Sequence, residues 1–113
     1  MAFKRGQFNT FGGKLEIEIL GEDGNPVTVT TQVKFKRPPQ AVVEDTGVFK
    51  EMKYSELLGE YLVSADVEDE AGVQLASRQA QLDAILAVPE IARGCVTLFF
   101  RGLFPQRESA QPA

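Results

Sequence analysis

The sequence predicts an α+β fold, in which an N-terminal antiparallel β-hairpin with strands at residues 14–20 and 27–37 is followed by three to four helices. Two observations predict the hairpin. Apolar and polar residues alternate in both segments, which is the two-residue period of a half-buried strand, and turn-forming residues lie between them. A third observation predicts the helical half, where apolar residues recur at the spacing of one helix face.

The length and composition are those of one globular domain. The chain has 113 residues, of which 43% are hydrophobic and 25% are charged, so it can bury a modest core. We expect a single domain over residues 1–105, with a loose N-terminal arm at residues 1–12. Residues 106–113 have no apolar anchor, and we expect a disordered tail there.

In the predicted hairpin, each strand gathers its apolar residues on one face. The sequence GEDGNP between the strands combines Gly, Asp, Asn and Pro, which favour tight turns. A lone hairpin is marginally stable in water, so we expect the helices to cover its apolar face. The residues predicted on that face are Leu15, Ile17 and Ile19 in the first strand and Val27, Val29, Val33 and Phe35 in the second.

The middle of the chain begins where proline ends the second strand. Pro38 and Pro39 have no N–H to donate to a strand ladder, and residues 40–45 after them favour a short helical turn. A longer helix is predicted at residues 56–63, where apolar residues share one face. Ser55 is placed to cap its first turn.

Two further helices are predicted near the C-terminus. The first covers residues 77–87, and the hydroxyl of Ser77 is placed to accept a hydrogen bond from its first turn. The second covers residues 89–104. Pro89 suits its first position because the missing N–H costs nothing there, and Glu90 lies near the positive end of the helix dipole.

The residue types present restrict the chemistry. The chain has no histidine, the commonest general base and metal ligand, and its one cysteine, Cys95, lies in an apolar stretch and is interpreted as a small hydrophobic residue. Residues 66–72 alternate carboxylates like an EF-hand loop, but Ala71 and Ser77 stand where that loop needs Gly and Glu. We therefore expect no enzyme activity, no metal and no cofactor.

Charge and hydropathy also restrict the partners. The formal net charge is −4 and no basic stripe is present, so we expect no nucleic acid partner, since nucleic acid binding depends on neutralising phosphates. No segment approaches the ~20 consecutive apolar residues of a membrane span, and no apolar run follows the basic residues of the N-terminus. The expected partners are proteins, and the expected location is the cytoplasm.

The last predicted helix is unusually rich in phenylalanine. Two adjacent stripes at helical spacing already supply a core face, and Phe100 and Phe104 extend the apolar surface beyond it. Either the helix is packed on two sides, or the additional surface binds a partner, as contiguous exposed apolar area usually does. The candidate protein-binding residues are Phe99, Phe100, Leu103 and Phe104.

Three phenylalanines before the hairpin raise the same question more weakly. Phe3, Phe8 and Phe11 lie in the predicted arm, which has few other apolar residues. An arm that docks on its own core, or on a neighbouring subunit, would bury them. Self-association is therefore one of the interactions that we expect for the N-terminal half.

Three segments also carry a family resemblance. They are VKFKRPP at residues 33–39, ELLGEYLVSADVEDEAG at residues 56–72 and QAQLDAILAVPEIARGCVTLFFRGLF at residues 79–104. In this order and spacing they resemble the tail assembly chaperones of long, non-contractile-tailed, lambda-like phages and prophages. No single segment is a catalytic fingerprint, so the specificity lies in their succession.

The resemblance implies a non-catalytic protein of tail morphogenesis. Such a chaperone would bind the aggregation-prone tape measure protein, help to recruit tail tube subunits around it, and then leave. It would act in the host bacterial cytoplasm and would be absent from the mature virion, and many relatives have a longer, frameshifted form. The alternative is a structural virion component, such as a minor tail protein or a head-tail connector.

Overall fold

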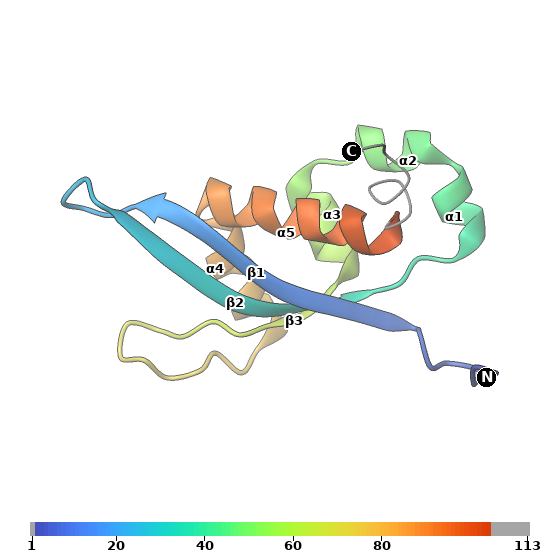
Figure 1. The fold of residues 1–113 in the computed structure, drawn as a ribbon, viewed down its shortest axis with the longest axis horizontal. Coiled ribbons are helices and arrows are strands. Elements are labelled where there is room, and N and C mark those ends of the chain that lie inside the picture. Colours follow the sequence, from blue (N-terminus) through green and yellow to red (C-terminus); the bar gives the residue numbers. More distant parts are fainter. Residues whose placement is uncertain (1, 105–113) are drawn as a thin grey trace, which may run out of the picture.

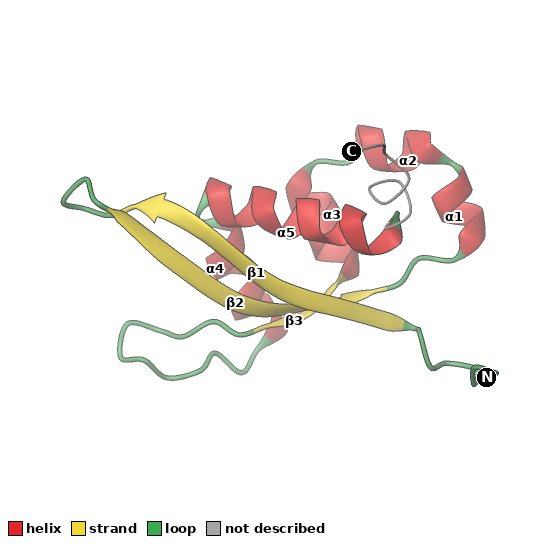
Figure 2. Ribbon diagram, in the orientation of Figure 1, coloured by secondary structure: helices red, strands yellow, loops and turns green. Residues whose placement is uncertain are grey.

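A computed structural model describes residues 2–104 as an α+β fold, drawn in Figures 1 and 2. In this part of the chain, helices cover one face of a three-stranded sheet. The elements, in chain order, are β1 (Thr10–Leu20), β2 (Pro26–Lys36), α1 (Gln40–Glu44), α2 (Thr46–Glu51), α3 (Tyr54–Tyr61), β3 (Leu62–Ala65), α4 (Arg78–Leu86) and α5 (Pro89–Leu103).

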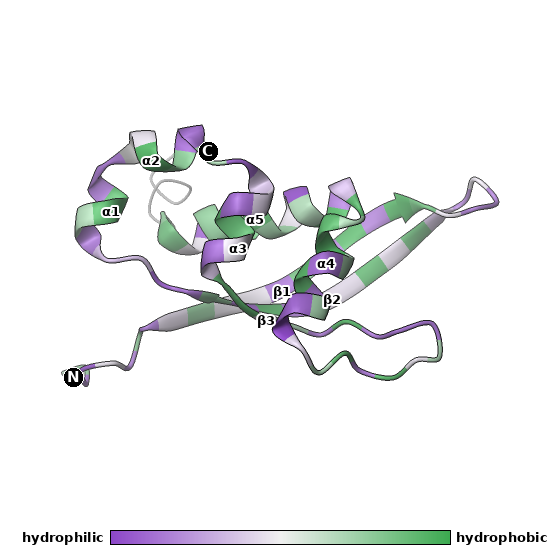
Figure 3. Cartoon of the chain, turned by 180° about the vertical axis from the view of Figure 1, so that it is seen from behind, coloured by the Kyte–Doolittle hydropathy of each residue, from purple (hydrophilic) through white to green (hydrophobic). Residues whose placement is uncertain are grey.

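The sheet has the strand order β1-β2-β3, and both pairings are antiparallel. β1 and β2 pair without interruption, from Thr10 opposite Lys36 to Leu20 opposite Pro26. Odd-numbered residues of β1 are partly or fully buried, whereas even-numbered residues are exposed. Figure 3 shows the matching alternation of hydrophobic and hydrophilic residues along the strands. The sheet therefore has one helix-covered face and one polar face.

The predicted hairpin is confirmed, with different ends. β2 begins and ends one residue earlier than predicted, and β1 begins four residues earlier, at Thr10. Residues 10–12 therefore belong to the sheet and not to a loose arm. Phe11 explains the extension, because its ring lies 5.7 Å from the ring of the buried Phe99. The predicted disordered tail lies outside the described residues.

The three longer predicted helices are confirmed to within two residues at each end. Ser77 caps α4 as predicted, since its hydroxyl accepts a hydrogen bond of 3.2 Å from the N–H of Ala80. Pro89 is the first residue of α5. The predicted cap at Ser55 is wrong, because α3 begins one residue before it, at Tyr54.

The third strand was not predicted. β3 follows α3 directly and pairs with β2, with Ala65 opposite Val33 and Leu62 opposite Phe35 and a bulge between the two pairs. Residues 40–45 contain the expected helical turn, which is α1, and a second short helix, α2, comes after it. Both short helices lie beside the C-terminal end of α5 in Figure 1.

The core is built around one aromatic side chain. Phe99 has no exposed surface, and its ring centroid lies between 5.2 and 6.0 Å from those of five other rings. Ring pairs at these separations add to the stability that apolar burial supplies. The five rings come from β1, β2, α2, α3 and α5: Phe11, Phe35, Phe49, Tyr61 and Phe100.

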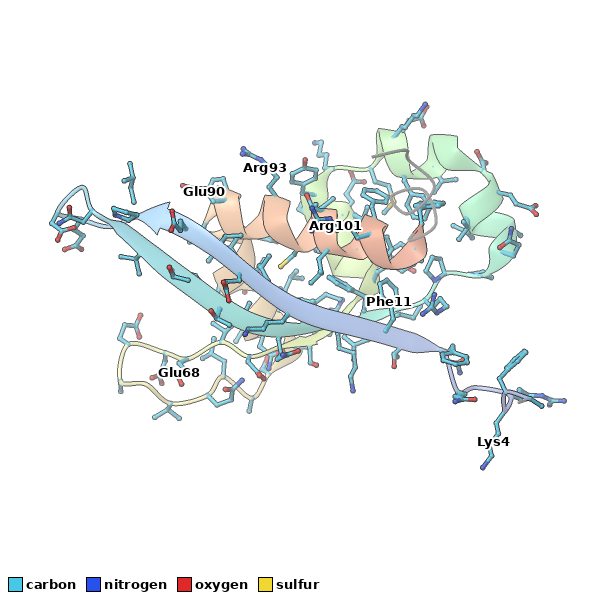
Figure 4. The ribbon with its side chains drawn as sticks, viewed as in Figure 1. Lys4, Phe11, Glu68, Glu90, Arg93 and Arg101 are labelled. Carbon is cyan, nitrogen blue, oxygen red and sulfur yellow. The ribbon has the colours of Figure 1, made fainter. Side chains whose placement is uncertain are left out.

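Two glycines let α5 lie close to β1. A Cβ atom on Gly94 would stand 2.8 Å from Cδ1 of Leu15, closer than any real Cβ contact. A Cβ atom on Gly102 would overlap the ring of Phe11. Large side chains of the strand therefore fill the two positions where the helix has no side chain. Figure 4 shows Phe11 beneath the C-terminal half of α5.

Between these two positions the arrangement is reversed. Leu98 of α5 lies over Gly13 of β1, and its Cδ1 atom is 3.3 Å from where a Cβ on Gly13 would be. The three contacts recur every four residues of the helix and every two of the strand, which are advances of about 6.0 and about 6.8 Å. Because the two advances nearly match, the helix and the strand interlock along their common length.

Candidate functional site

The four candidate protein-binding residues lie together at the C-terminal end of α5, but they differ in burial. Phe100, Leu103 and Phe104 are partly buried, whereas Phe99 is completely buried at the centre of the core. Phe99 is therefore removed from the candidate contact residues, because a side chain with no exposed surface cannot meet a partner in this conformation. The other three remain candidates.

Phe100 packs on Phe49 of α2, and Leu103 and Phe104 follow it by three and four residues at the end of α5. We call Phe49, Phe100, Leu103 and Phe104 the aromatic seam. The rings of Phe49 and Phe100 lie 5.7 Å apart and are nearly perpendicular, at 83°. Among the described side chains of α1 and α2, Phe49 alone is buried. The two short helices are therefore anchored to the rest of the protein mainly through Phe49, whose ring also contacts those of Tyr61 and Phe99.

The rim of the aromatic seam is also apolar. Val42 of α1 and Met52, which follows α2, pack against the core while remaining partly exposed, and Val48 of α2 is 37% exposed. Methionine adapts its shape to different apolar neighbours. Segments with few buried contacts open at lower free energy than the core. An outward movement of α1 and α2 would open an apolar cleft between these side chains and Phe100.

The N-terminal segment carries a second exposed apolar pair. Phe3 and Phe8 are 74% and 53% exposed, and their rings contact each other at 6.2 Å. The Nε of Arg37 donates a hydrogen bond of 2.7 Å to the carbonyl oxygen of Phe8 and so ties this segment to the end of β2. Of the three phenylalanines before the predicted hairpin, Phe11 docks on the core of its own chain and the other two do not.

One edge of the sheet is closed by polar side chains of α4. The N–H of Ala65 donates a hydrogen bond of 3.0 Å to Oε1 of Gln81, and Nε of Arg78 donates one of 2.6 Å to the carbonyl oxygen of Leu62. Gln81 is 6% exposed and also donates to the carbonyl oxygen of Leu75 at 2.7 Å. Neither Gln81 nor Arg78 was predicted from the sequence to have this role. The available signal was a glutamine at a core position of α4.

The acidic segment between β3 and α4 forms a turn organised by one carboxylate. Oδ1 of Asp69 accepts hydrogen bonds from the N–H groups of Ala71 and Val73, at 2.9 and 3.0 Å, and Gly72 has a φ of +82°. This carboxylate stabilises a turn, as in other Asx turns. Within residues 2–104, no group of three or more His, Cys, Asp or Glu side chains is placed to hold a metal ion.

Cys95 is fully buried in α5, and burial raises the pKa of its thiol to about 11. The thiol is therefore protonated near neutral pH. Because the thiolate is the nucleophilic form, Cys95 acts here as a core residue. This agrees with the interpretation of Cys95 as a small hydrophobic side chain.

No helix in the described part of the chain has the length and apolar character needed to cross a membrane. Comparison with known proteins adds no assignment. No family model, no curated protein and no solved structure matches the chain.

Proposed function

We propose that this protein is a phage tail assembly chaperone that binds tape measure protein and tail tube subunits without catalysis. The observation that best supports the proposal is the aromatic seam, because it offers apolar side chains that are partly accessible beside two lightly anchored helices. The succession of segments at residues 33–39, 56–72 and 79–104 agrees with the same proposal.

The proposed mechanism is reversible apolar association. Displacement of α1 and α2 from α5 would open an apolar cleft, with Phe49 on the displaced α2 and Phe100 and Leu103 on α5. Such a cleft suits the apolar face of a helical client. The net charge of −4 keeps the complex in solution. When the client is handed to tail tube subunits, α2 returns and Phe49 again packs on Phe100.

Co-expression with the tape measure protein of the same phage tests the site. The wild-type chain is expected to raise the soluble fraction of tape measure protein, and the double variant Phe100→Asp/Phe104→Asp is expected to lose that effect, because two charges would enter an apolar interface. Val73→Asp is the matched control, since Val73 is 60% exposed in the segment between β3 and α4. Circular dichroism of each purified variant separates lost binding from lost folding.

The possible outcomes test the location of the client site and the chaperone function separately. A folded double variant that solubilises tape measure protein as well as wild type would place the client site elsewhere. A wild-type chain with no effect on tape measure protein would contradict the chaperone function itself. Mass spectrometry of purified virions provides an independent check, because stoichiometric recovery of this chain would favour a structural virion component instead.

A further inference from the structure

The hydrogen-bonding pattern of β1 identifies which of its main-chain groups face outward. Just beyond the two ends of the β1-β2 ladder, Gly21 donates to the carbonyl oxygen of Asn25 at 2.9 Å and Arg37 donates to that of Asn9 at 2.7 Å. Both pairs continue the register of the ladder. Bonded and non-bonded pairs alternate in antiparallel sheets, so the odd-numbered residues of β1 bond to β2. The N–H and C=O groups of the even-numbered residues point away from β2.

These outward groups form a long, unpaired edge. None of the hydrogen bonds found in residues 2–104 reaches them. An unpaired edge strand is a template for another strand, and β1 offers eleven residues, without a proline or a bulge to block pairing. The six outward residues are Thr10, Gly12, Lys14, Glu16, Glu18 and Leu20.

The space beside this edge is open. A groove of about 440 Å³ lies between β1 and α5, and its apolar lining includes Leu15, Ile17 and Leu98. Glu90, Arg93 and Arg101 of α5 border the same groove and add one negative and two positive charges. Figure 4 shows the side chains of Glu90 and Arg93 on α5 above β1. An added strand therefore meets an apolar lining and charged side chains of both signs.

Charge selects one register for a second copy of β1. An antiparallel partner can hydrogen-bond to this edge only when even-numbered residues lie opposite even-numbered residues. Centring the pair on residue 14 sets Lys14 against Lys14, and centring it on residue 16 sets Glu16 against Glu16. Centring it on Leu15 sets Lys14 against Glu16 of the other copy twice. Opposite charges across a ladder stabilise it and like charges destabilise it.

The same register uses the whole strand. With Leu15 on the two-fold axis, Thr10 lies opposite Leu20 of the other copy, so all eleven residues are paired and up to about 12 main-chain hydrogen bonds form. On the helix-covered face, Ile17 lies opposite Gly13 of the other copy. Ile17 thus lies beside the position where Leu98 packs over Gly13, on each side of the axis. Leu20, which is 70% exposed in the single chain, gains a neighbour.

We propose that β1 pairs antiparallel with β1 of a second copy of this chain, about a two-fold axis at Leu15, to form one continuous six-stranded sheet with three strands from each copy. The isologous pairing closes on itself, so it produces a dimer and no longer array. This inference goes beyond the proposed function and does not rest on it.

Charge exchange on the full-length chain tests the register. Sedimentation is measured from about 1 to about 500 µM, a range that covers micromolar dissociation constants. Lys14→Glu and Glu16→Lys are each expected to raise the dimer dissociation constant about tenfold or more, because each change sets like charges opposite one another at both symmetric pairs. A mixture of the two variants, and the double variant Lys14→Glu/Glu16→Lys, are expected to associate as wild type does.

Lys36→Glu is the matched control for net charge. Lys36 lies on the same polar face but in β2, where its Nζ is 3.9 Å from Oε1 of Glu60, and the change is expected to leave the dissociation constant within about threefold of wild type. Lys14 and Glu16 are 58% and 61% exposed, so thermal melting should show intact folding in every variant. A wild-type chain that stays monomeric throughout overturns the proposal. So does a dimer that Lys14→Glu and Lys36→Glu weaken equally, or a mixture that fails to associate.

Discussion

The two edges of the sheet are finished in opposite ways. At β3, the short edge strand is sealed from within the chain, because Gln81 and Arg78 bond to main-chain groups of Ala65 and Leu62. At β1, the long edge strand has no such partner in residues 2–104, although α5 packs tightly on its face. The difference shows that covering the face of a strand does not satisfy its edge. Within residues 2–104, the main-chain groups of this sheet that remain free to bond a partner therefore lie mainly along β1.

Amide exchange should give the largest contrast between the edges. In solution dilute enough to dissociate the proposed dimer, the Ala65 amide is expected to exchange on the order of a thousandfold more slowly than the amides of Lys14 and Glu16, after correction for intrinsic rates. The reason is that the Ala65 N–H is bonded to a buried side chain, whereas the other two face solvent. Exchange measured by NMR checks this. Similar protection of the amides at both edges would mean that the outward N–H groups of β1 are already hydrogen-bonded.

Removing the seal at β3 should destabilise the protein strongly. Gln81→Leu leaves the Ala65 N–H and the Leu75 carbonyl oxygen without their side-chain partner, at an expected cost of about 2–4 kcal/mol in the free energy of unfolding. Urea denaturation measures it. Gln79→Leu is the control on the same helix, because within residues 2–104 the side chain of Gln79 bonds to the exposed Asp83 alone, and it should change stability by less than about 0.5 kcal/mol. Equal losses of unfolding free energy in the two variants would show that the hydrogen bonds of Gln81 to Ala65 and Leu75 add no stability of their own.

A smaller effect is expected where α5 lies on β1. Gly102→Ala should destabilise the protein by about 1 kcal/mol, because the crowding of Phe11 outweighs the better helix propensity of alanine. Gly59→Ala in α3 is the matched control. Nothing lies within 4 Å of a Cβ at Gly59, so propensity alone should act and stabilise by up to about 1 kcal/mol. Thermal melting that moves both variants in the same direction would contradict close packing at Gly102.

Much of the fold followed from the sequence because its signals are local. Alternation located the hairpin, and Ser77 and Pro89 located the starts of α4 and α5. Gly12 and Gly13 concealed the start of β1, since glycine pairs are typical of turns. Their role appears only in three dimensions, where a Cβ on Gly12 would overlap the carbonyl oxygen of Val33. β3 was missed because four residues after a helix carry too little periodicity.

The candidate site was predicted less completely. Helical spacing was compatible with Phe99 as a core residue and as a contact residue. Only the side chains packed around it decide that it belongs to the core. Phe49 completes the aromatic seam from a different element, and nothing in the spacing of α5 points to it. The hydrogen bonds of Gln81 and Arg78 to β3 were not predicted for a similar reason. Gln81 acts through a strand that is 16 positions away in sequence, so its role depends on tertiary structure.

The interlocking of α5 with β1 sets a limit on its own length. Four residues of helix advance about 6.0 Å and two residues of strand about 6.8 Å. Each repeat therefore offsets the helix positions from the strand positions by about 0.8 Å. Across the three contacts at Gly94, Leu98 and Gly102 the accumulated offset is about 1.6 Å, which side chains can absorb. With further repeats the offset would grow, and the side chains of one element would no longer face the gaps of the other. The helix ends at Leu103, one residue after the third of these contacts.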